Sequence, residues 1–418
     1  MRRAMSRRPL EGIVVADLSR VLAGPFATMM LADLGAEVIK VEHPERGDDT
    51  RAWGPPDAGG EAAYYLALNR GKQGLAIDVK DPDGLRIVQD LCDRADVVIE
   101  NFRPGVADRL GLGSAAVRER NPGVVYCSIS GFGARRKPAD RPGFDAVIQA
   151  ESGLMHITGE ESPTKVGVAI TDVLTAFNAT VAILAALRHR DRTGEGDHID
   201  VSLLGSALAG LTNVTQSAIV SGQEAKRYGS AHPSVVPYQP FPTADGEIMI
   251  AAGNDALYRK LCEVIGRPEL GDDPRFATNA DRIRNRDALI SQIIAELRAK
   301  DGETWTNALL EAGVPVGKIR GVREALAAAA EAGDPATFTV EHPTAGPLEL
   351  VRNGFELAGM ADAPPPAPPP LLGQHTRDVL TWLGLTAPEI TALEDRRVVR
   401  QAPLEPTQLD PRTEIERN

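Results

Sequence analysis

The chain has 418 residues, with 46 lysines and arginines against 58 aspartates and glutamates, so its formal net charge at pH 7 is −12. Its length predicts two or three domains, and 43% hydrophobic residues are enough for a large core. Because no basic block follows the first eight residues, a nucleic-acid partner is not expected. No apolar run is expected to be long enough to span a membrane.

The amino terminus and the cysteines bear on the location of the protein. The start, MRRAMSRRPL, is basic but lacks the apolar segment of a secretory signal. We interpret it as a solvated terminus, with an organelle transit peptide as the alternative. Cys92, Cys127 and Cys262 are far apart, and neither cysteines nor histidines show metal-type spacing. These features favour a cytoplasmic protein without a bound metal.

In the first 130 residues, short apolar strands alternate with helices. Strands are predicted at residues 13–18, 37–42, 96–100 and 124–129. One helix is expected to begin at Pro25 and stop at Gly35, and DPDGLRIVQDLCDRA, with a capping aspartate, predicts a second. This alternation predicts βαβ units and an α/β fold with a mainly parallel sheet.

Ligands of such sheets bind beyond the carboxyl ends of the strands. The loops expected there are SRVLAG (19–24), NFRPG (101–105) and SGFG (130–133), whose Gly, Arg and Asn residues suit a phosphate-bearing ligand. No GxGxxG follows the first strand and no GxxxxGK[ST] occurs, which disfavours an NAD site or a P-loop.

The second half of the chain contains segments of different predicted structure. VLTAFNATVAILAALRHR, directly after Asp172, is apolar on almost every side and predicts a core helix, and 198–204 predicts another strand. From YQPFPTADGEIMIAAGND onward we expect a smaller α+β unit. It would contain a hairpin in TADGEIMIAA, a helix near 281–300 and a last connection at 313–319. The proline-rich residues 361–375 predict an extended strap, followed by one helix around TRDVLTWLGL.

Six motifs in a fixed order resemble class III CoA-transferases. They are GIVVADLSRVLAGPFATMMLADLGAEVIKVEHP, NRGKQGLAIDVK, DVVIENFRPG, GFDAVIQAESGLMHITGE, KVGVAITD and TGEGDHIDVSLL. SGQEAKRYGSAHPSVVPYQPF and PPPLLGQHT are most similar to the succinyl-CoA–glutarate CoA-transferases of that family. The resemblance covers nearly the whole chain.

The resemblance implies a fold and an assembly. The expected fold has a large Rossmann-like domain with a parallel sheet and a smaller α+β domain, and two chains form an interlocked homodimer. The large domain would take residues 1–222 and the small domain 223–330. Residues 331–418 would supply the linker, the strap and a C-terminal segment that completes the large domain.

The resemblance also implies the reaction. CoA would move between an acyl-CoA, expected to be succinyl-CoA, and a short dicarboxylic acid through an aspartyl anhydride and an aspartyl–CoA thioester. The CoA thioester is a substrate, and no permanently bound cofactor, nucleic acid or membrane partner is expected. The acceptor acid is not identified, and His232 and Arg227 are the candidates to bind its second carboxylate.

Asp172 is the central residue of this interpretation. From sequence alone it is placed as a helix N-cap, a position that aspartate favours. By resemblance it is the nucleophile, and a helix N-terminus would help to keep it ionised. Gly253, in the turn AAGND, takes the place of the glycine-rich loop of the family, and Asp145 matches an acidic position near the reacting centre, although it could simply cap a helix.

Several residues match CoA-binding positions of the family. Val21, Leu22 and Ala23 would line the first loop, Lys72 would contact a phosphate, and Arg109 would pair with the diphosphate or the 3′-phosphate. The loop after the third predicted strand would contribute Asn101, Phe102 and Arg103. For each cation taken singly, a solvated surface charge is the alternative.

Three other functions are less compatible with the sequence than CoA transfer. An α-methylacyl-CoA racemase shares the fold, but racemase relatives carry histidine where this chain has Phe144, and phenylalanine cannot accept a proton. A non-catalytic CoA-binding protein would not need Asp172. A serine hydrolase is disfavoured because no GxSxG occurs.

Overall fold

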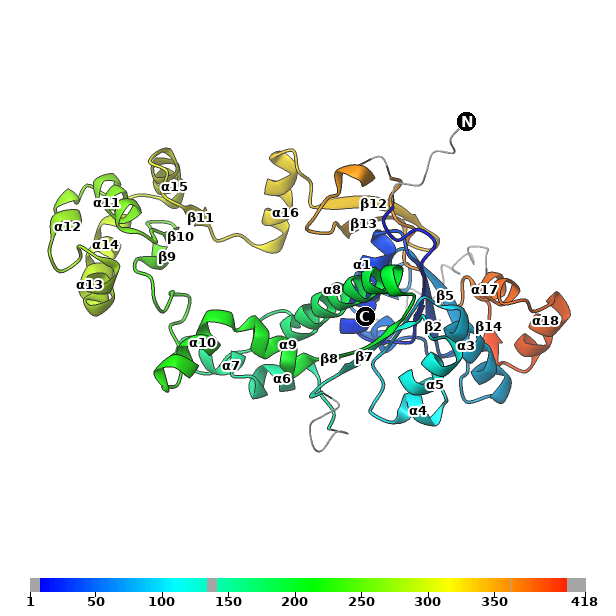
Figure 1. Cartoon of the computed structure of the whole chain (residues 1–418). Coiled ribbons are helices and arrows are strands. Elements are labelled where there is room, and N and C mark those ends of the chain that lie inside the picture. Colours follow the sequence, from blue (N-terminus) through cyan, green and yellow to red (C-terminus); the bar gives the residue numbers. More distant parts are fainter. Residues whose placement is uncertain (1–7, 134–140, 362, 404–418) are drawn as a thin grey trace. The chain divides into compact units, whose positions relative to one another are not determined.

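The structure is a computed structural model that describes residues 8–133, 141–361 and 363–403 (Figure 1). The basic start, residues 1–7, lies outside the described residues. The chain divides into two compact units. Unit 1 is Met1–Ser152, Gly167–Thr212 and Ala336–Asn418, and unit 2 is Gly153–Val166 and Asn213–Pro335. These bounds differ most from the predicted domains at 153–166, which we had assigned to the large domain.

Unit 1 is built on a mostly parallel sheet, as predicted. Within the described residues seven strands form it, in the order β14-β5-β2-β1-β6-β7-β8. They are β1 (Val14–Asp17), β2 (Glu37–Glu42), β5 (Lys72–Ile77), β6 (Val97–Glu100), β7 (Val125–Ser130), β8 (Asp197–Ser202) and β14 (Val399–Arg400). Only the pairing of β14 with β5 is antiparallel among the contacts of this sheet in the described chain. We did not predict β5 and β14, because β5 begins Lys-Gln-Gly and β14 has two residues.

The strand order reverses at β1. From β1 the chain continues to β2 on one side, whereas β6 pairs with β1 on the other side. At such a switch point the loops after the two central strands leave in opposite directions, and a crevice opens between them. The loops after β1 and β6 contain residues 18–22 and 101–105, so two of the three predicted ligand loops meet at this crevice.

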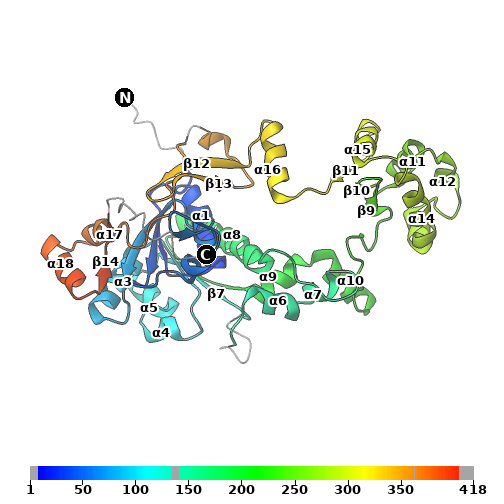
Figure 2. The ribbon, with the colours of Figure 1, turned by 180° about the vertical axis from the view of Figure 1, so that it is seen from behind.

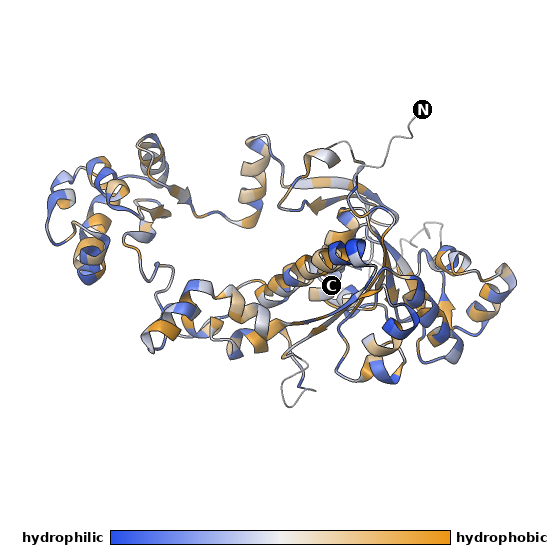
Figure 3. Ribbon diagram, viewed as in Figure 1, coloured by the Kyte–Doolittle hydropathy of each residue, from blue (hydrophilic) through white to orange (hydrophobic). Residues whose placement is uncertain are grey.

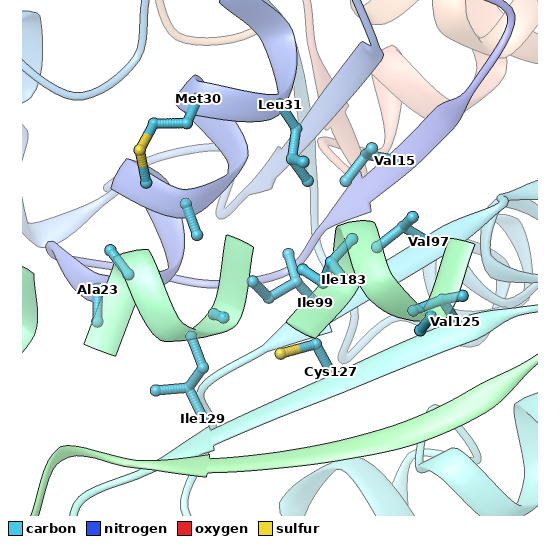
Figure 4. Packing of buried hydrophobic residues seen from close by; sticks show 14 of the residues in the cluster. Val15, Ala23, Met30, Leu31, Val97, Ile99, Val125, Cys127, Ile129 and Ile183 are labelled. Atoms are coloured by element: carbon cyan, nitrogen blue, oxygen red, sulfur yellow. The ribbon is translucent and has the colours of Figure 1, made fainter. Parts of the chain in front are cut away.

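Helices cover both faces of the sheet of unit 1 (Figure 2). One apolar cluster joins the sheet to α1 (Ala23–Asp33), α8 (Ile170–Thr193) and α9 (Leu203–Gly210). Figure 4 shows its packing, with Leu31 and Ile183 directed at strand residues such as Val15 and Val97. A second cluster joins the other face to α3 (Pro82–Arg94), α5 (Ser114–Arg120), α17 (Thr376–Trp382) and α18 (Ala387–Asp395). We had expected one helix in the C-terminal region, and α18 is a second.

The caps and ends of the helices agree in part with the predictions. Asp81 caps α3 and accepts hydrogen bonds from the backbone N–H groups of Asp83 and Gly84. Helix α1 begins at Ala23, two residues before Pro25, and ends at the predicted place because Gly35 adopts a φ of 105°. The shorter elements of unit 1 are α2 (Ala63–Leu66), α4 (Val106–Arg109), α6 (Asp145–Glu151), η1 (Asp49–Ala52), η2 (Ala358–Met360), β3 (Asp57–Ala58), β4 (Glu61–Ala62), β12 (Thr337–His342) and β13 (Gly346–Val351).

Helix α8 is long and apolar, as Figure 3 shows, until polar residues fill its last turns. By length and composition it could cross a membrane, so the prediction that no apolar run is long enough was wrong for this helix. Its contacts are those of a core helix: Ala176, Ala179 and Ile183 are fully buried against α1 and the sheet. Burial in the core therefore accounts for the apolar residues on this face of α8, whereas Phe177 and Val181 are large apolar residues of the same helix that stay exposed.

The proline-rich strap is tied to unit 1 by backbone contacts. The carbonyl of Ala367 accepts a hydrogen bond from the N–H of Gly71 at 2.8 Å. The carbonyl of Pro370 accepts from Arg51 and from the Tyr65 hydroxyl, each at 3.1 Å. The described part of the strap forms no helix or strand, which agrees with its composition.

Unit 2 contains the predicted hairpin. Strands β9 (Tyr238–Pro242) and β10 (Glu247–Ala251) pair antiparallel, and β11 (Val316–Lys318) adds to β10. The predicted helix near 281–300 is two helices, α13 and α14, which break at Asn285. The helices in this part of the chain are α7 (Leu154–Ile157), α10 (Thr212–Ser221), α11 (Asp255–Val264), α12 (Pro268–Asp272), α13 (Asn279–Arg284), α14 (Arg286–Leu297), α15 (Gly302–Glu311) and α16 (Val322–Glu331).

Candidate active site

A cavity of about 260 Å³ lies in unit 1 at the loops that follow β1, β6 and β7. It brings together most of the site residues predicted from sequence. Those on its wall are Asp172, Val21, Leu22, Ala23, Asn101, Phe102 and Arg103. Three elements that are distant in sequence supply them, as expected for the carboxyl edge of a parallel sheet.

Asp172 lies in the first turn of α8, on the cavity wall. The helix begins at Ile170 with Ala169 as its N-cap, so the prediction that Asp172 is the N-cap was wrong by three positions. In the described chain no group donates a hydrogen bond to its carboxylate. A half-buried carboxylate without such partners can approach a substrate in the cavity.

The pKa of Asp172 is raised from 3.8 to about 7, first by burial and then by the negative charge of Asp145. Both effects disfavour the ionised form. The amino end of α8 acts in the opposite direction, because its N–H groups favour a nearby negative charge. Burial and the charge of Asp145 thus raise the energy of the ionised carboxylate that the helix position alone would favour.

Asp145 is buried and supports the start of α8. One carboxylate oxygen accepts hydrogen bonds from the N–H of Thr171 at 2.9 Å and from its hydroxyl at 2.8 Å. The other accepts from Gln149 at 2.7 Å. Asp145 thus caps α8 and not its own helix, α6, whose N-cap is Phe144, and it fixes the residue directly before Asp172. Its carboxylate is engaged by these donors and is not part of the cavity wall.

Two aromatic residues near Asp172 were missed from sequence. Burial raises the pKa of the Tyr64 hydroxyl, and the next cause is the charge of Asp172. Trp53 lies on the cavity wall and contacts Tyr64 edge to face, with ring centroids 5.1 Å apart. No sequence signal links them to Asp172, because Trp53 directly follows η1 and Tyr64 lies in the short helix α2, both in the irregular segment after β2.

A second cavity of about 400 Å³ adjoins the first, and Arg20, Asp49 and Phe102 line both. Its wall combines aliphatic side chains such as Val41 and Ile77 with cationic ones. Its exposed cations include Arg46, Lys80 and Arg109. Arg109 therefore lies at a cavity, and its contact with a CoA phosphate stays a prediction, whereas Arg46 and Lys80 were not predicted.

Lys72 does not reach either cavity. Its ammonium group is fully buried and donates to Asp17 at 3.1 Å, to Asn69 at 2.9 Å and to the carbonyl of Pro25 at 2.9 Å. All three of its donors are used, so the expected phosphate contact has no support in this geometry. The sequence pattern around Lys72 could not separate a buried ion pair from an exposed cation.

The remaining candidates belong to unit 2. Gly253 lies in the loop between β10 and α11, and a methyl group added there would meet Val235 at an ordinary distance of 3.6 Å. Arg227 donates to the carbonyls of His156 and Glu161, and the ring of His232 accepts from the N–H of Ser234. No group of three or more His, Cys, Asp or Glu residues that could hold a metal ion occurs in the described ranges.

The sequence model of the family described as "CoA-transferase family III" matches residues 10–376 of this chain. This chain belongs to CoA-transferase family III. The CoA-transferase is 42% identical over 395 residues to the succinyl-CoA:glutarate CoA-transferase of Homo sapiens, covering 94% of this chain and 88% of the relative. It is 46% identical over 327 residues to the succinate–glutarate CoA-transferase of Agrobacterium fabrum, covering 76% and 82%.

Solved structures agree with this assignment. The CoA-transferase is similar to a CAIB/BAIF family protein from Brucella suis, with a TM-score of 0.79 and 38% sequence identity. The match covers 90% of this chain and 100% of that protein. The resemblance identified from the six motifs is thereby confirmed, and so is the CoA-transferase activity.

Proposed function

We propose that this CoA-transferase moves CoA between succinyl-CoA and a short dicarboxylic acid, with Asp172 as the nucleophile. The observation that carries the proposal is a half-buried carboxylate without hydrogen-bond donors on the wall of a cavity. The relatives named above support succinyl-CoA and a dicarboxylate as the substrate pair.

The proposed reaction needs no net proton transfer. The carboxylate of Asp172 attacks the thioester carbonyl, the C–S bond breaks, and CoA leaves as a thiolate, which gives an aspartyl–succinyl anhydride. The thiolate attacks the aspartyl carbonyl, releases succinate and forms an aspartyl–CoA thioester. The acceptor carboxylate then attacks this thioester, and the same two steps in reverse regenerate Asp172 and release the new acyl-CoA.

The environment of Asp172 suits this chemistry. Burial and Asp145 raise the energy of its charged form, as its pKa of about 7 indicates. Forming an ester-like or thioester bond removes that charge, so part of the cost is relieved in the covalent intermediates. Asp145 acts on Asp172 through Thr171, because it holds the first turn of α8 in place.

We assign CoA to the two adjoining cavities. The aliphatic wall and the cations of the larger cavity suit a nucleotide with phosphates, including Arg109, and the loops with Val21 and Asn101 would guide the pantetheine toward Asp172. For Gly253 we propose a place in a loop whose N–H groups stabilise the oxyanion of each tetrahedral intermediate.

Arg141 is the best candidate to bind the second carboxylate of the acyl group. It lies on the wall of the same cavity as Asp172, pairs with Glu151 at 2.6 Å and stacks over Phe132. These contacts hold the guanidinium group while part of its hydrogen-bonding capacity stays available. Arg227 and His232, the candidates for this role from the sequence, belong to unit 2.

Phe144 argues against the racemase alternative, because it lies on the cavity wall and cannot exchange a proton. A 2-methylacyl-CoA incubated with the enzyme in D₂O should gain no α-deuterium. Rapid exchange would favour the racemase.

We also propose an interlocked homodimer in the cytoplasm. An exposed apolar stripe supports a partner surface in unit 1, since Phe177 and Val181 of α8 are 47% and 66% exposed although both are large and apolar. Leu208 of α9 is 39% exposed and adds to the exposed apolar surface of unit 1. A second copy of the chain would cover it.

The experiment that tests the function is a search for the covalent intermediate. The enzyme is incubated with succinyl-CoA and trapped with hydroxylamine or borohydride, and peptides are analysed by mass spectrometry. Modification should fall on Asp172. Asp172→Ala should abolish transfer and still bind CoA, whereas the control Asp191→Ala, at the far end of α8, should keep both. Normal turnover by Asp172→Ala would refute the mechanism.

A further inference from the structure

We propose that Asp48, held by Lys40, is a positioning residue that keeps Val21 in a left-handed conformation and thereby shapes the CoA site before substrate arrives. This inference rests on the proposed function, because it assumes that a CoA thioester occupies the two cavities. It concerns residues that act through the loop rather than on the reacting atoms.

The backbone of Val21 has an unusual conformation. Its φ is 71°, a region that branched L-residues rarely adopt, since their side chain crowds the neighbouring backbone. Val21 lies on the wall of the cavity that contains Asp172. Strained backbone at a ligand site persists only where surrounding contacts hold it, and such strain is often part of how a site is pre-formed.

Asp48 supplies those contacts. Both of its carboxylate oxygens accept from the N–H of Val21, at 3.3 and 3.2 Å. Asp48 is itself fixed, because it is buried and accepts from Lys40 at 2.9 Å and from the N–H and hydroxyl of Thr50 at 2.9 and 2.8 Å. Burial acts to raise the pKa of Asp48, but Lys40 and these hydrogen bonds hold it at about 2.

The residues beside Val21 are held in the same way. The side chain of Asn101 accepts from the N–H of Arg20 at 2.9 Å and donates to its carbonyl at 2.7 Å. Lys40 donates to the carbonyl of Ser19 at 3.1 Å. The loop after β1 is therefore bound from the β2 side by Asp48 and Lys40 and from the β6 side by Asn101.

This loop separates the two cavities. Val21 lines the smaller cavity, Asp48 and Lys40 line the larger one, and Arg20 lines both. The strained conformation of Val21 thus determines the shape of the cavity wall along which a CoA thioester would lie. A wall fixed in advance lowers the ordering cost of binding, so the clamp should act on affinity more than on the chemical steps.

The test compares three single variants and one double variant. Asp48→Ala removes both acceptors, and Asp48→Asn keeps the size and one acceptor. Asp96→Ala is the matched control, because Asp96 also accepts a backbone N–H, that of Val14 at 2.8 Å, and pairs with a cation, Arg190 at 2.9 Å. It does so at the opposite end of β1, away from both cavities.

CoA affinity is measured by calorimetry, and kcat and KM for succinyl-CoA are measured separately. Asp48→Ala should raise the Kd for CoA and the KM by at least about tenfold while kcat changes less than about threefold. Asp48→Asn should fall between it and the wild type. Asp96→Ala should lower the Tm without changing Kd or KM by more than about twofold.

The double variant with Asp48→Ala and Val21→Gly should have a Kd for CoA at least about threefold lower than that of Asp48→Ala alone, because glycine adopts a positive φ without strain. A purely structural loss would not respond to that change. If Asp48→Ala does not fold, Asp48→Asn with and without Val21→Gly gives the same comparison.

Unchanged affinity in a folded Asp48 variant, or no rescue by Val21→Gly, would overturn the clamp alone. Failure of the wild type to bind CoA would overturn the proposed function and the clamp with it. If the wild type binds CoA but the trapping experiment with succinyl-CoA finds no modified Asp172, only the proposed mechanism would be overturned.

Discussion

Replacing Asp172 by asparagine should stabilise the folded protein above pH 7 while it removes activity. The pKa of Asp172 is raised from 3.8 to about 7, chiefly by burial and then by Asp145, so its charged form is disfavoured in the fold. At about 1.36 kcal/mol for each pKa unit, this rise corresponds to about 4 kcal/mol of destabilisation when the group is ionised. Because the carboxylate is partly exposed to water, this value is an upper limit.

The size of this stabilisation changes with pH in a defined window. Below about pH 4 the carboxyl group is protonated in both folded and unfolded chains, so asparagine should give little gain. Between about pH 4 and pH 7 the folded state keeps its proton while the unfolded state loses it, and the wild type loses stability as pH rises. The advantage of Asp172→Asn should therefore grow across this window and level off above pH 7.

Urea unfolding at pH 5, 6, 7 and 8, at one protein concentration, would measure this difference. Asp81→Asn is the control of opposite sign, because backbone hydrogen bonds from Asp83 and Gly84, together with Arg396, lower the pKa of Asp81. It should not stabilise the protein at any pH. An equal gain for Asp172→Asn at pH 5 and pH 8, or no gain at pH 8, would refute the reasoning about burial.

The pH dependence, the acyl specificity and the oligomeric state of the enzyme can each be tested separately. With Asp172 as the nucleophile and a pKa of about 7, kcat/KM should fall about tenfold per pH unit below pH 7, and a flat profile down to pH 5 would contradict this. Succinyl-CoA should exceed butyryl-CoA by at least about 100-fold in kcat/KM, or roughly 2.7 kcal/mol, and Arg141→Gln should remove most of that preference; an unchanged ratio would exclude Arg141 as the anchor. Dilution to nanomolar concentration should leave a dimer in light scattering, and a folded, active monomer would refute the interlocked assembly.

Much of the fold was predictable because its signals are local. The strands at 37–42 and 124–129 are short segments rich in β-branched and other apolar residues, and Asp81 at the start of α3 is a cap that depends only on the next three residues. The apolar composition of α8 indicated a core position before any contact was known. The motif order identified the family and selected Asp172, because a family resemblance needs no three-dimensional information.

What only the tertiary structure decided concerns contacts between residues distant in sequence. Lys72 reads as an available cation, but the packing of β5 beside β2 buries it against Asp17, 55 residues away. Asp145 reads as a cap of its own helix, yet it caps α8, 26 residues later. Likewise Val21 carries no unusual sequence signal, and its strained φ is maintained by Asp48, 27 residues along the chain.

The physical reason is the same in each case. Periodicity and capping act over a few residues, so the sequence determined which segments become strands and helices and which loops end at the ligand edge. The energy of a buried charge depends on which partner the sheet order brings within hydrogen-bonding distance. That order, with β1 between β2 and β6, decided which polar residues form the site and which ones hold it in place.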